Sequence, residues 1–188
     1  MIPDNKGNRI LVVGGSGFIG SHVVPRAISM GMDVTFTGTH ENKPGLASGE
    51  AEYICLDTTD RDAVYHALHG RQFEYVVNCG GYINHAGIHD GGYQVTREHF
   101  YSVVNLIEAI PRDSLQCFVN LGSSDEYGSC SAPQRENMRE QAISPYSAAK
   151  LAATHFLQML WHSEEFPAVT LRLFLVYGPG QGENRFLP

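Results

Sequence analysis

Residues 9–20 read Arg9-Ile10-Leu11-Val12-Val13-Gly14-Gly15-Ser16-Gly17-Phe18-Ile19-Gly20, and this stretch decides the fold of the 188-residue chain. The nearly continuous apolar run 9–13 is typical of a strand that is buried on both faces of a parallel sheet. The glycines that follow end the strand, and an amphipathic stretch from Phe18 to Met30, with Gly31 as its stop, predicts a helix. The sequence therefore predicts a strand, a tight glycine turn and a helix in direct succession.

The same alternation continues along the rest of the chain. Apolar runs predict five further strands, at 33–37, 53–56, 75–79, 116–121 and 169–176. Helices are predicted after a cap at Thr59 or Asp60, over 96–110, and from a Ser144 cap with Pro145 at the first position to about 162. This order predicts an α/β fold, a Rossmann-type doubly wound parallel sheet with helices on both faces. The weakly periodic segments 38–50 and 80–95 are predicted to be flexible loops.

Composition narrows the classes of partner and compartment. The formal net charge is -7, whereas nucleic-acid binding needs clustered Lys and Arg, so no nucleic-acid partner is expected. No stretch approaches the ~20 apolar residues that span a bilayer, and the N-terminus lacks the apolar core of a signal peptide. We therefore expect a cytoplasmic protein without membrane contact. The four cysteines form no C-x-x-C pair and are predicted to be small buried residues in a reducing compartment: Cys55, Cys79, Cys117 and Cys130.

The glycine loop is the first candidate binding element. Gly15, Gly17 and Gly20 satisfy the pattern G-x-G-x-x-G, and Gly14, Gly17 and Gly20 satisfy G-x-x-G-x-x-G. A backbone without side chains can approach a pyrophosphate, and the helix start offers N–H groups and a positive dipole end. A turn that binds nothing is the alternative, but the strand before the loop and the helix after it favour a dinucleotide.

The end of the second predicted strand does not choose between NAD and NADP. Dinucleotide-binding folds usually carry an acid there, which binds the ribose 2′-OH. Here the residues are Thr37-Gly38-Thr39-His40, with Glu41 slightly late and no Arg for a 2′-phosphate. The cofactor is therefore predicted as NAD or NADP, with weak discrimination between them.

Tyr146 and Lys150 are the candidate catalytic pair. Their spacing of four residues places both on one face of the predicted helix that begins at Pro145. A nearby ammonium favours the phenolate form of a tyrosine, so Tyr146 could remove a hydroxyl proton while hydride leaves the same carbon. A surface Tyr–Lys neighbour pair is the alternative. The position of the pair after the fifth predicted strand of a dinucleotide fold favours the catalytic interpretation.

The whole pattern resembles the extended short-chain dehydrogenase/reductase family, the NAD-dependent nucleotide-sugar epimerases and dehydratases. The resemblance rests on six segments in order: Gly14 to Ser21, Asp57 to Asp60, Asn78 to Gly81, Gly122 to Gly128, Ser144 to Lys150, and Arg172 to Gly180. It implies cofactor contacts at Gly14, Gly17, Phe18, Ile19, Gly20, Asp57, Thr58, Gly80, Gly81, Tyr146, Lys150 and Phe174. It also implies a catalytic Ser–Tyr–Lys set: Ser123 or Ser124 with Tyr146 and Lys150.

The sequence departs from the family pattern at several positions. Aligned without a gap, the family serine falls on Ser123; with one deletion it falls on Ser124, and Asp125 and Glu126 then take the dehydratase acid–base positions. His99 stands where the family commonly has Asn, and Leu175 where a substrate-binding Asn is frequent. The resemblance also implies a further domain for the nucleotide sugar. Residues 1–188 are therefore predicted to form the NAD(P)-binding domain, with the C-terminal substrate domain absent or truncated.

The resemblance implies an oxidoreductase that exchanges hydride at a sugar carbon of a nucleotide-sugar substrate. A 4-epimerase is favoured; the alternatives are a 4,6-dehydratase, a 4-keto-reductase or a non-catalytic dinucleotide-binding module.

His85, His89 and Asp90 are interpreted as a solvated loop, and no metal is predicted. An apolar stripe on the last helix packs in the core or, as the resemblance implies, forms a homodimer through the helices 96–110 and 145–162; it comprises Leu151, Phe156, Leu157, Leu160 and Trp161.

Overall fold

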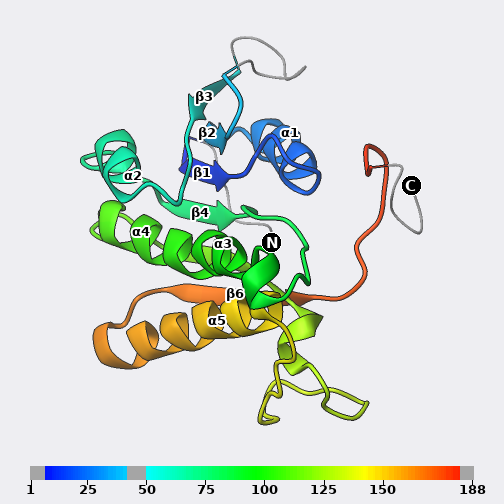
Figure 1. The fold of residues 1–188 in the computed structure, drawn as a ribbon. Helices are drawn as coiled ribbons and strands as arrows, with labels where there is room; N and C mark the ends of the chain where they lie inside the picture. Colours follow the sequence, from blue (N-terminus) through cyan, green and yellow to red (C-terminus); the bar gives the residue numbers. More distant parts are fainter. Residues whose placement is uncertain (1–6, 42–49, 183–188) are drawn as a thin grey trace.

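The computed structural model describes residues 7–41 and 50–182. Its centre is a parallel six-stranded sheet in the order β3-β2-β1-β4-β5-β6 (Figure 1). The strands are β1 Arg9–Val13, β2 Asp33–Gly38, β3 Ala51–Cys55, β4 Tyr75–Asn78, β5 Cys117–Ser123 and β6 Ala168–Leu173. The strand order reverses between β1 and β4, which is where doubly wound sheets open a crevice at the carboxyl ends of their strands. The predicted α/β fold is confirmed.

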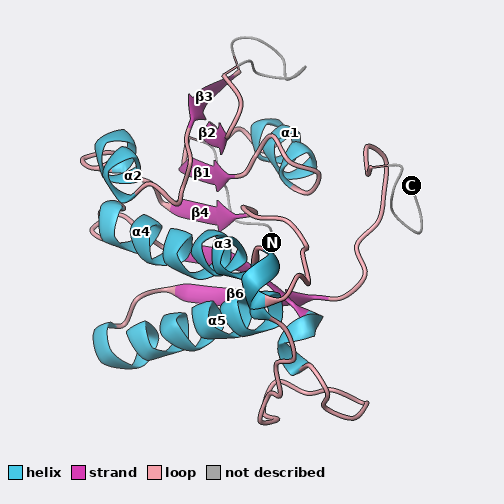
Figure 2. Cartoon of the chain, in the orientation of Figure 1, coloured by secondary structure: helices cyan, strands magenta, loops and turns pink. Residues whose placement is uncertain are grey.

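Helices cover the sheet and connect its strands (Figure 2). They are α1 Gly20–Ser29, α2 Arg61–Leu68, α3 Gly92–Thr96, the π-helical turn η2 Arg97–Tyr101, α4 Ser102–Ala109 and α5 Pro145–Glu164, with short 3-10 turns η1 Ile88–Asp90 and η3 Ser124–Tyr127. None of the described helices is long and apolar enough to cross a membrane.

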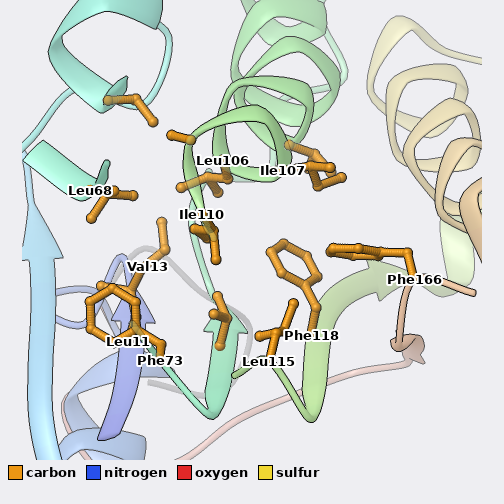
Figure 3. Close-up of a cluster of buried hydrophobic side chains, with 14 of the residues drawn as sticks. Leu11, Val13, Leu68, Phe73, Leu106, Ile107, Ile110, Leu115, Phe118 and Phe166 are labelled. Atoms are coloured by element: carbon orange, nitrogen blue, oxygen red, sulfur yellow. The ribbon is translucent and has the colours of Figure 1, made fainter. Parts of the chain in front are cut away.

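Two apolar clusters hold the helices against opposite faces of the sheet. Along β1, Leu11 and Val13 join the larger cluster with α2, α4 and α5, whereas Ile10 and Val12 join the smaller cluster under α1. Figure 3 shows the larger cluster, in which Leu106 of α4 and Phe118 of β5 are completely buried. Successive strand residues point to opposite faces, so the apolar run 9–13 serves both clusters.

The helix caps follow the sequence signals. The Asp60 carboxylate accepts a hydrogen bond from the Ala63 N–H at 3.0 Å and caps α2. The Ser144 hydroxyl accepts from the Ser147 N–H at 3.1 Å, and Pro145 occupies the first turn of α5. These bonds satisfy N–H groups that have no partner within the helix, so both predicted starts are confirmed.

Several predicted boundaries were wrong. The helix predicted from Phe18 begins at Gly20, and the strand predicted to reach Val176 ends at Leu173. Leu173 pairs with Ser123, the last residue of β5, so β6 has no partner beyond it. The segment predicted as the loop 80–95 contains η1 and the start of α3, because Gly91 at φ 112° allows the chain to turn from one into the other. Of the predicted loop 38–50, residues 42–49 lie outside the described residues.

The cysteines also differ in part from the prediction. All four are free thiols, but Cys55 at the end of β3 is exposed, and Cys79, Cys117 and Cys130 are half-buried. Cys55 is exposed because β3 is the edge strand of the sheet. In residues 7–41 and 50–182, no three His, Cys, Asp or Glu side chains gather as a metal-binding group would.

Candidate active site

The glycine loop lies between β1 and α1 and is closely packed. Gly14 has φ 69°, and a Cβ on it would lie 2.9 Å from the Gly80 Cα. A Cβ on Gly20 would lie 2.5 Å from the Gly15 Cα. Real Cβ contacts are longer, so these glycines allow the loop to pack against β4 and the start of α1.

Gly17 has a different environment from its neighbours. It is exposed, and a Cβ built on it would meet one atom within 4 Å, the Gly14 carbonyl oxygen at 3.2 Å. The first turn of α1 begins three residues later, where N–H groups lack partners within the helix. A bare backbone that faces open space at a helix N-terminus fits the pyrophosphate of a dinucleotide.

A cavity of about 550 Å³ lies at the carboxyl ends of β4, β5 and β6, beside the end of the glycine loop. Eight of the site residues expected from the sequence line it: Phe18, Ile19, Gly80, Gly81, Ser123, Tyr146, Lys150 and Phe174. They come from five parts of the chain that are far apart in sequence. The fold therefore brings the end of the glycine loop and the proposed catalytic residues to one cavity.

The other expected residues lie elsewhere. Gly14, Gly17 and Gly20 form the loop, and Ser124 begins η3 away from the cavity lining. Asp57 and Thr58 follow β3, where the Asp57 carboxylate accepts from the Thr59 N–H at 2.8 Å. The Thr58 carbonyl accepts from the Asn105 amide at 2.9 Å, which ties this turn to α4.

Lys150 is buried, with 7% of its surface exposed. Its Nζ donates to the Leu121 carbonyl at 2.7 Å, which fixes the ammonium beside β5. Burial lowers the pKa of Lys150 to about 8, against the opposing effect of Glu126 and Cys79. The ammonium is therefore the main form at neutral pH, and it is held in the cavity that Tyr146 also lines.

The geometry favours Ser123 over Ser124. The Ser123 hydroxyl lies in the cavity lining and accepts from the Asp125 N–H at 3.1 Å, so it can still donate its own proton. Glu126 is fully buried and does not line the cavity: its carboxylate accepts from the Ser123 N–H at 2.9 Å, from Arg172 Nε at 2.8 Å and from the Thr154 hydroxyl at 2.9 Å. A carboxylate held in this way is unsuited to the acid–base position that the shifted alignment gave it.

Two imidazoles flank the ring of Tyr146. The His99 and His85 rings meet it edge-on, with centroids 4.9 and 5.4 Å away. His99 is buried, and burial followed by the Lys150 charge lowers its pKa to about 4. Its Nε2 lies 2.7 Å from the Tyr82 carbonyl, so Nε2 carries the proton of this neutral ring.

His85 is a site residue that the sequence did not reveal. Its Nε2 lies 2.7 Å from the Asp125 carboxylate, 40 residues along the chain. The sequence interpretation assigned His85 to a solvated loop, and it is indeed half-exposed. No local pattern could have paired it with Asp125, because the contact forms only when the turn after β4 packs beside η3.

The arrangement brings three functional groups to one cavity. Tyr146 supplies a phenol, Lys150 an ammonium and Ser123 a hydroxyl. Together they can move a proton to or from a hydroxyl group and stabilise the oxygen that loses it.

The chain is similar to known enzymes of nucleotide-sugar metabolism. It is 24% identical to the dTDP-D-glucose 4,6-dehydratase of Bos taurus, over 99% of this chain and 55% of that protein. It is 27% identical to a putative UDP-glucose 4-epimerase of Methanocaldococcus jannaschii, over 92% of this chain and 57% of that protein. The chain thus spans little more than half the length of these relatives.

Solved structures show the same fold. The UDP-N-acetylglucosamine 4-epimerase from Methanobrevibacter ruminantium, in complex with UDP-N-acetylmuramic acid, superimposes with a TM-score of 0.83 and 25% identity, covering 96% of this chain and 59% of that one. The UDP-glucuronic acid 4-epimerase from Bacillus cereus, in complex with NAD, gives 0.77 at 24% identity, covering 92% and 58%. The model of one family matches residues 10–188. The chain therefore belongs to the NAD dependent epimerase/dehydratase family.

Proposed function

We propose that this chain is the dinucleotide-binding part of an enzyme that oxidises and re-reduces a ring carbon of a nucleotide sugar, as a 4-epimerase does. One observation carries the proposal: Ser123, Tyr146 and Lys150 line the same cavity as Phe18 and Ile19, which end the glycine loop. The cofactor is NAD or NADP, which supplies a hydride acceptor when bound.

The proposed roles follow from the chemistry of each side chain. Tyr146 removes the proton of a sugar hydroxyl while the attached carbon loses hydride, and it returns the proton when hydride comes back. Lys150 stabilises the phenolate through its charge and offers a hydrogen bond to the cofactor ribose. The Ser123 hydroxyl donates a hydrogen bond to the substrate oxygen.

The comparisons support this substrate class. The relatives named above act on dTDP- or UDP-linked sugars, and the chain covers the half of them that aligns with the sheet described here. We therefore propose that binding of the nucleotide sugar also requires polypeptide outside these 188 residues. A cytoplasmic location remains the expectation from composition. A dinucleotide-binding module without catalysis is the contrasting outcome.

A 4,6-dehydratase is the second candidate, and His85 favours it. Elimination of water from an oxidised sugar requires a base for a carbon-bound proton next to the new carbonyl, in addition to Tyr146. The His85–Asp125 pair, 2.7 Å apart and beside the Tyr146 ring, offers such a second acid–base group. The similarity to the Bos taurus dehydratase agrees with this candidate.

The test is turnover of a panel of dTDP- and UDP-sugars by protein that contains this chain and its full natural reading frame. Tyr146→Phe keeps the ring and its packing but deletes the phenolic hydroxyl. We expect turnover to fall by at least ~100-fold while cofactor binding, measured by calorimetry, stays within about 3-fold.

Tyr101→Phe is the matched control, because this tyrosine is exposed on the helical segment before α4 and does not line the cavity. It should keep parental rates. Full activity of Tyr146→Phe would exclude the proposed base, and a parent that binds cofactor but turns over no sugar would favour the non-catalytic module.

A further inference from the structure

The end of β2 carries a steric restriction that bears on the choice of cofactor. Gly38, its last residue, is buried, and a Cβ built on it would clash with the Ser16 hydroxyl. The same Cβ would lie 2.9 Å from the Ser16 Cβ and 3.0 Å from the Tyr53 hydroxyl. Contacts of this length are not tolerated, so no side chain fits at position 38 while Ser16 keeps its place.

Ser16 cannot easily move aside. The glycine loop is tied to β2 by the Gly14 N–H, which donates to the Thr37 hydroxyl at 3.1 Å, and by the Ser16 N–H, which donates to the Thr37 carbonyl at 3.4 Å. Thr37 is itself buried. On the other side, the Gly38 carbonyl accepts from the Leu56 N–H at 2.8 Å. These bonds hold the backbones of Ser16 and Gly38, so rotation of the Ser16 hydroxyl would still leave its Cβ 2.9 Å from a Cβ at position 38.

This place normally decides between the two nicotinamide dinucleotides. An acid at the end of the second strand binds the 2′-OH of NAD, and its charge disfavours the 2′-phosphate of NADP. Here the strand ends in Gly38, which has no side chain, and the neutral Ser16 hydroxyl lies where its Cβ would be. Between Asp33 at the opposite end of β2 and Glu41 after the strand, residues 34–40 contain no carboxylate.

We infer that the Ser16–Gly38 contact removes the acid-based selection for NAD, so that this chain binds dinucleotides with and without a 2′-phosphate about equally well. The inference rests on the proposed function, because it assumes that the glycine loop binds the pyrophosphate. The Ser16 hydroxyl serves as the neutral hydrogen-bonding group for the 2′ substituent of the adenosine ribose. A hydroxyl can donate to a phosphate oxygen and can also accept from a ribose hydroxyl.

Calorimetric titration of the 188-residue chain with NAD+ and with NADP+ tests the inference directly. We expect dissociation constants within about 10-fold of each other. The double variant Ser16→Gly with Gly38→Asp removes the clash and supplies the acid, so it should prefer NAD+ by at least ~30-fold. Ser16→Gly alone removes the hydroxyl that is proposed to serve both dinucleotides, so it should weaken the binding of both and keep their ratio within about 10-fold.

The outcomes separate the inference from the proposed function. Binding of both dinucleotides with a parental preference for NAD+ beyond about 100-fold would overturn the inference and leave the proposed function standing. Glu41→Gln would then test whether Glu41 acts as the missing acid. Binding of neither dinucleotide to the folded parent, checked by circular dichroism, would overturn both. A folded double variant without any gain in NAD+ preference would show that the acid-binding place is elsewhere.

Discussion

At the scale of single residues, the site buries two side chains that can carry a charge, those of Lys150 and His99. His99 is 3% exposed and lies between the Gly81 backbone, Tyr82 and the Tyr146 ring. It lies in a π-helical turn, a feature that often marks functional sites. Because its surroundings hold it neutral, His99 positions Tyr146 by packing and does not exchange protons near neutral pH.

The buried His99 makes the folded state sensitive to acid. Its pKa falls from 6.5 to about 4 on folding, so the unfolded chain binds more protons between these values. The stabilising effect of the neutral ring is complete above pH 6.5 and is lost as the pH falls through 4. We expect the free energy of unfolding, measured by urea titration, to drop by on the order of 3 kcal/mol over this range from His99 alone.

The variant His99→Asn removes the titrating group and should flatten that part of the pH dependence, whatever it does to stability at pH 7. His162→Asn, on the exposed last turn of α5, is the control and should leave the pH dependence unchanged. An equally steep loss of stability in both variants would show that His99 is not the group responsible.

Residue-scale prediction from sequence had a clear limit. Tyr146 and Lys150 were predicted from their helical spacing, and Ser123 or Ser124 from the resemblance to the family. The structure brings Ser123, Tyr146 and Lys150 to one cavity. The pairing of His85 with Asp125 was not predicted, because the two residues are 40 positions apart and no local pattern links them. Gly38 was noticed only as a missing acid, and its clash with Ser16 needed the fold.

At the scale of elements, α5 organises the site. Its cap at Ser144 stands two residues before Tyr146 and six before Lys150, so the first two turns of this helix carry both side chains. Ser147 completes the cap, because its hydroxyl accepts from the Ser144 N–H at 2.9 Å. Because reciprocal hydrogen bonds fix the start of the helix, they also fix where the phenol of Tyr146 and the ammonium of Lys150 lie relative to each other.

Loss of this cap should therefore reduce stability in proportion to one lost side-chain bond. We expect Ser144→Ala to lower the free energy of unfolding by about 1 kcal/mol in urea titration. Ser163→Ala near the end of the same helix deletes an exposed hydroxyl that bonds the Met159 carbonyl, and should change stability by less than ~0.5 kcal/mol. Equal effects of both variants would mean that the Ser144 cap makes no special contribution.

Elements with strong periodicity were predicted well, and those set by tertiary contact were not. The apolar run 9–13 and the Ser144-Pro145 start depend on local signals, which sequence displays. The helical segment from 92 to 101 has no long repeat, because it changes from α to π geometry within ten residues. The end of β6 is decided by the end of β5, its only partner strand in the described sheet.

At the scale of the whole molecule, the two faces of the sheet are covered unequally. Helices α2, α4 and α5 pack against one face, while α1 covers β1 and β2 on the other. On that second face of β6, Val169 and Leu171 are 48% and 43% exposed. Parallel sheets normally have both faces covered, so the exposure of these two apolar side chains is an unusual feature of β6.

The sheet face that carries the larger cluster presents a second apolar surface, made by α5 and by the continuous helical segment η2–α4 beside it (Figure 1). We call it the α4–α5 surface. Phe100 and Phe156 pack edge to face at 5.9 Å between these segments, and Leu157 and Leu160 are buried in the core. Tyr101 and Met159 remain exposed, at 51% and 45%. Of the predicted stripe, Leu157 and Leu160 thus lie in the core and Trp161 is exposed. Tyr101 and Met159, which are outside the stripe, offer a surface that can pair with a second copy.

We predict a homodimer in which the α4 and α5 surfaces of two chains face each other. Light scattering behind gel filtration should give twice the 20.7 kDa chain mass at micromolar concentration. Tyr101→Arg with Met159→Arg places four positive charges in the symmetric interface, because a two-fold contact uses the same patch on both chains, and should yield monomers. Trp161→Arg is the control: Trp161 is 54% exposed on α5 but lies toward β6, beside Ala168 and Thr170. If the parent is monomeric, or if Trp161→Arg alone breaks the dimer, the α4–α5 surface is not the interface.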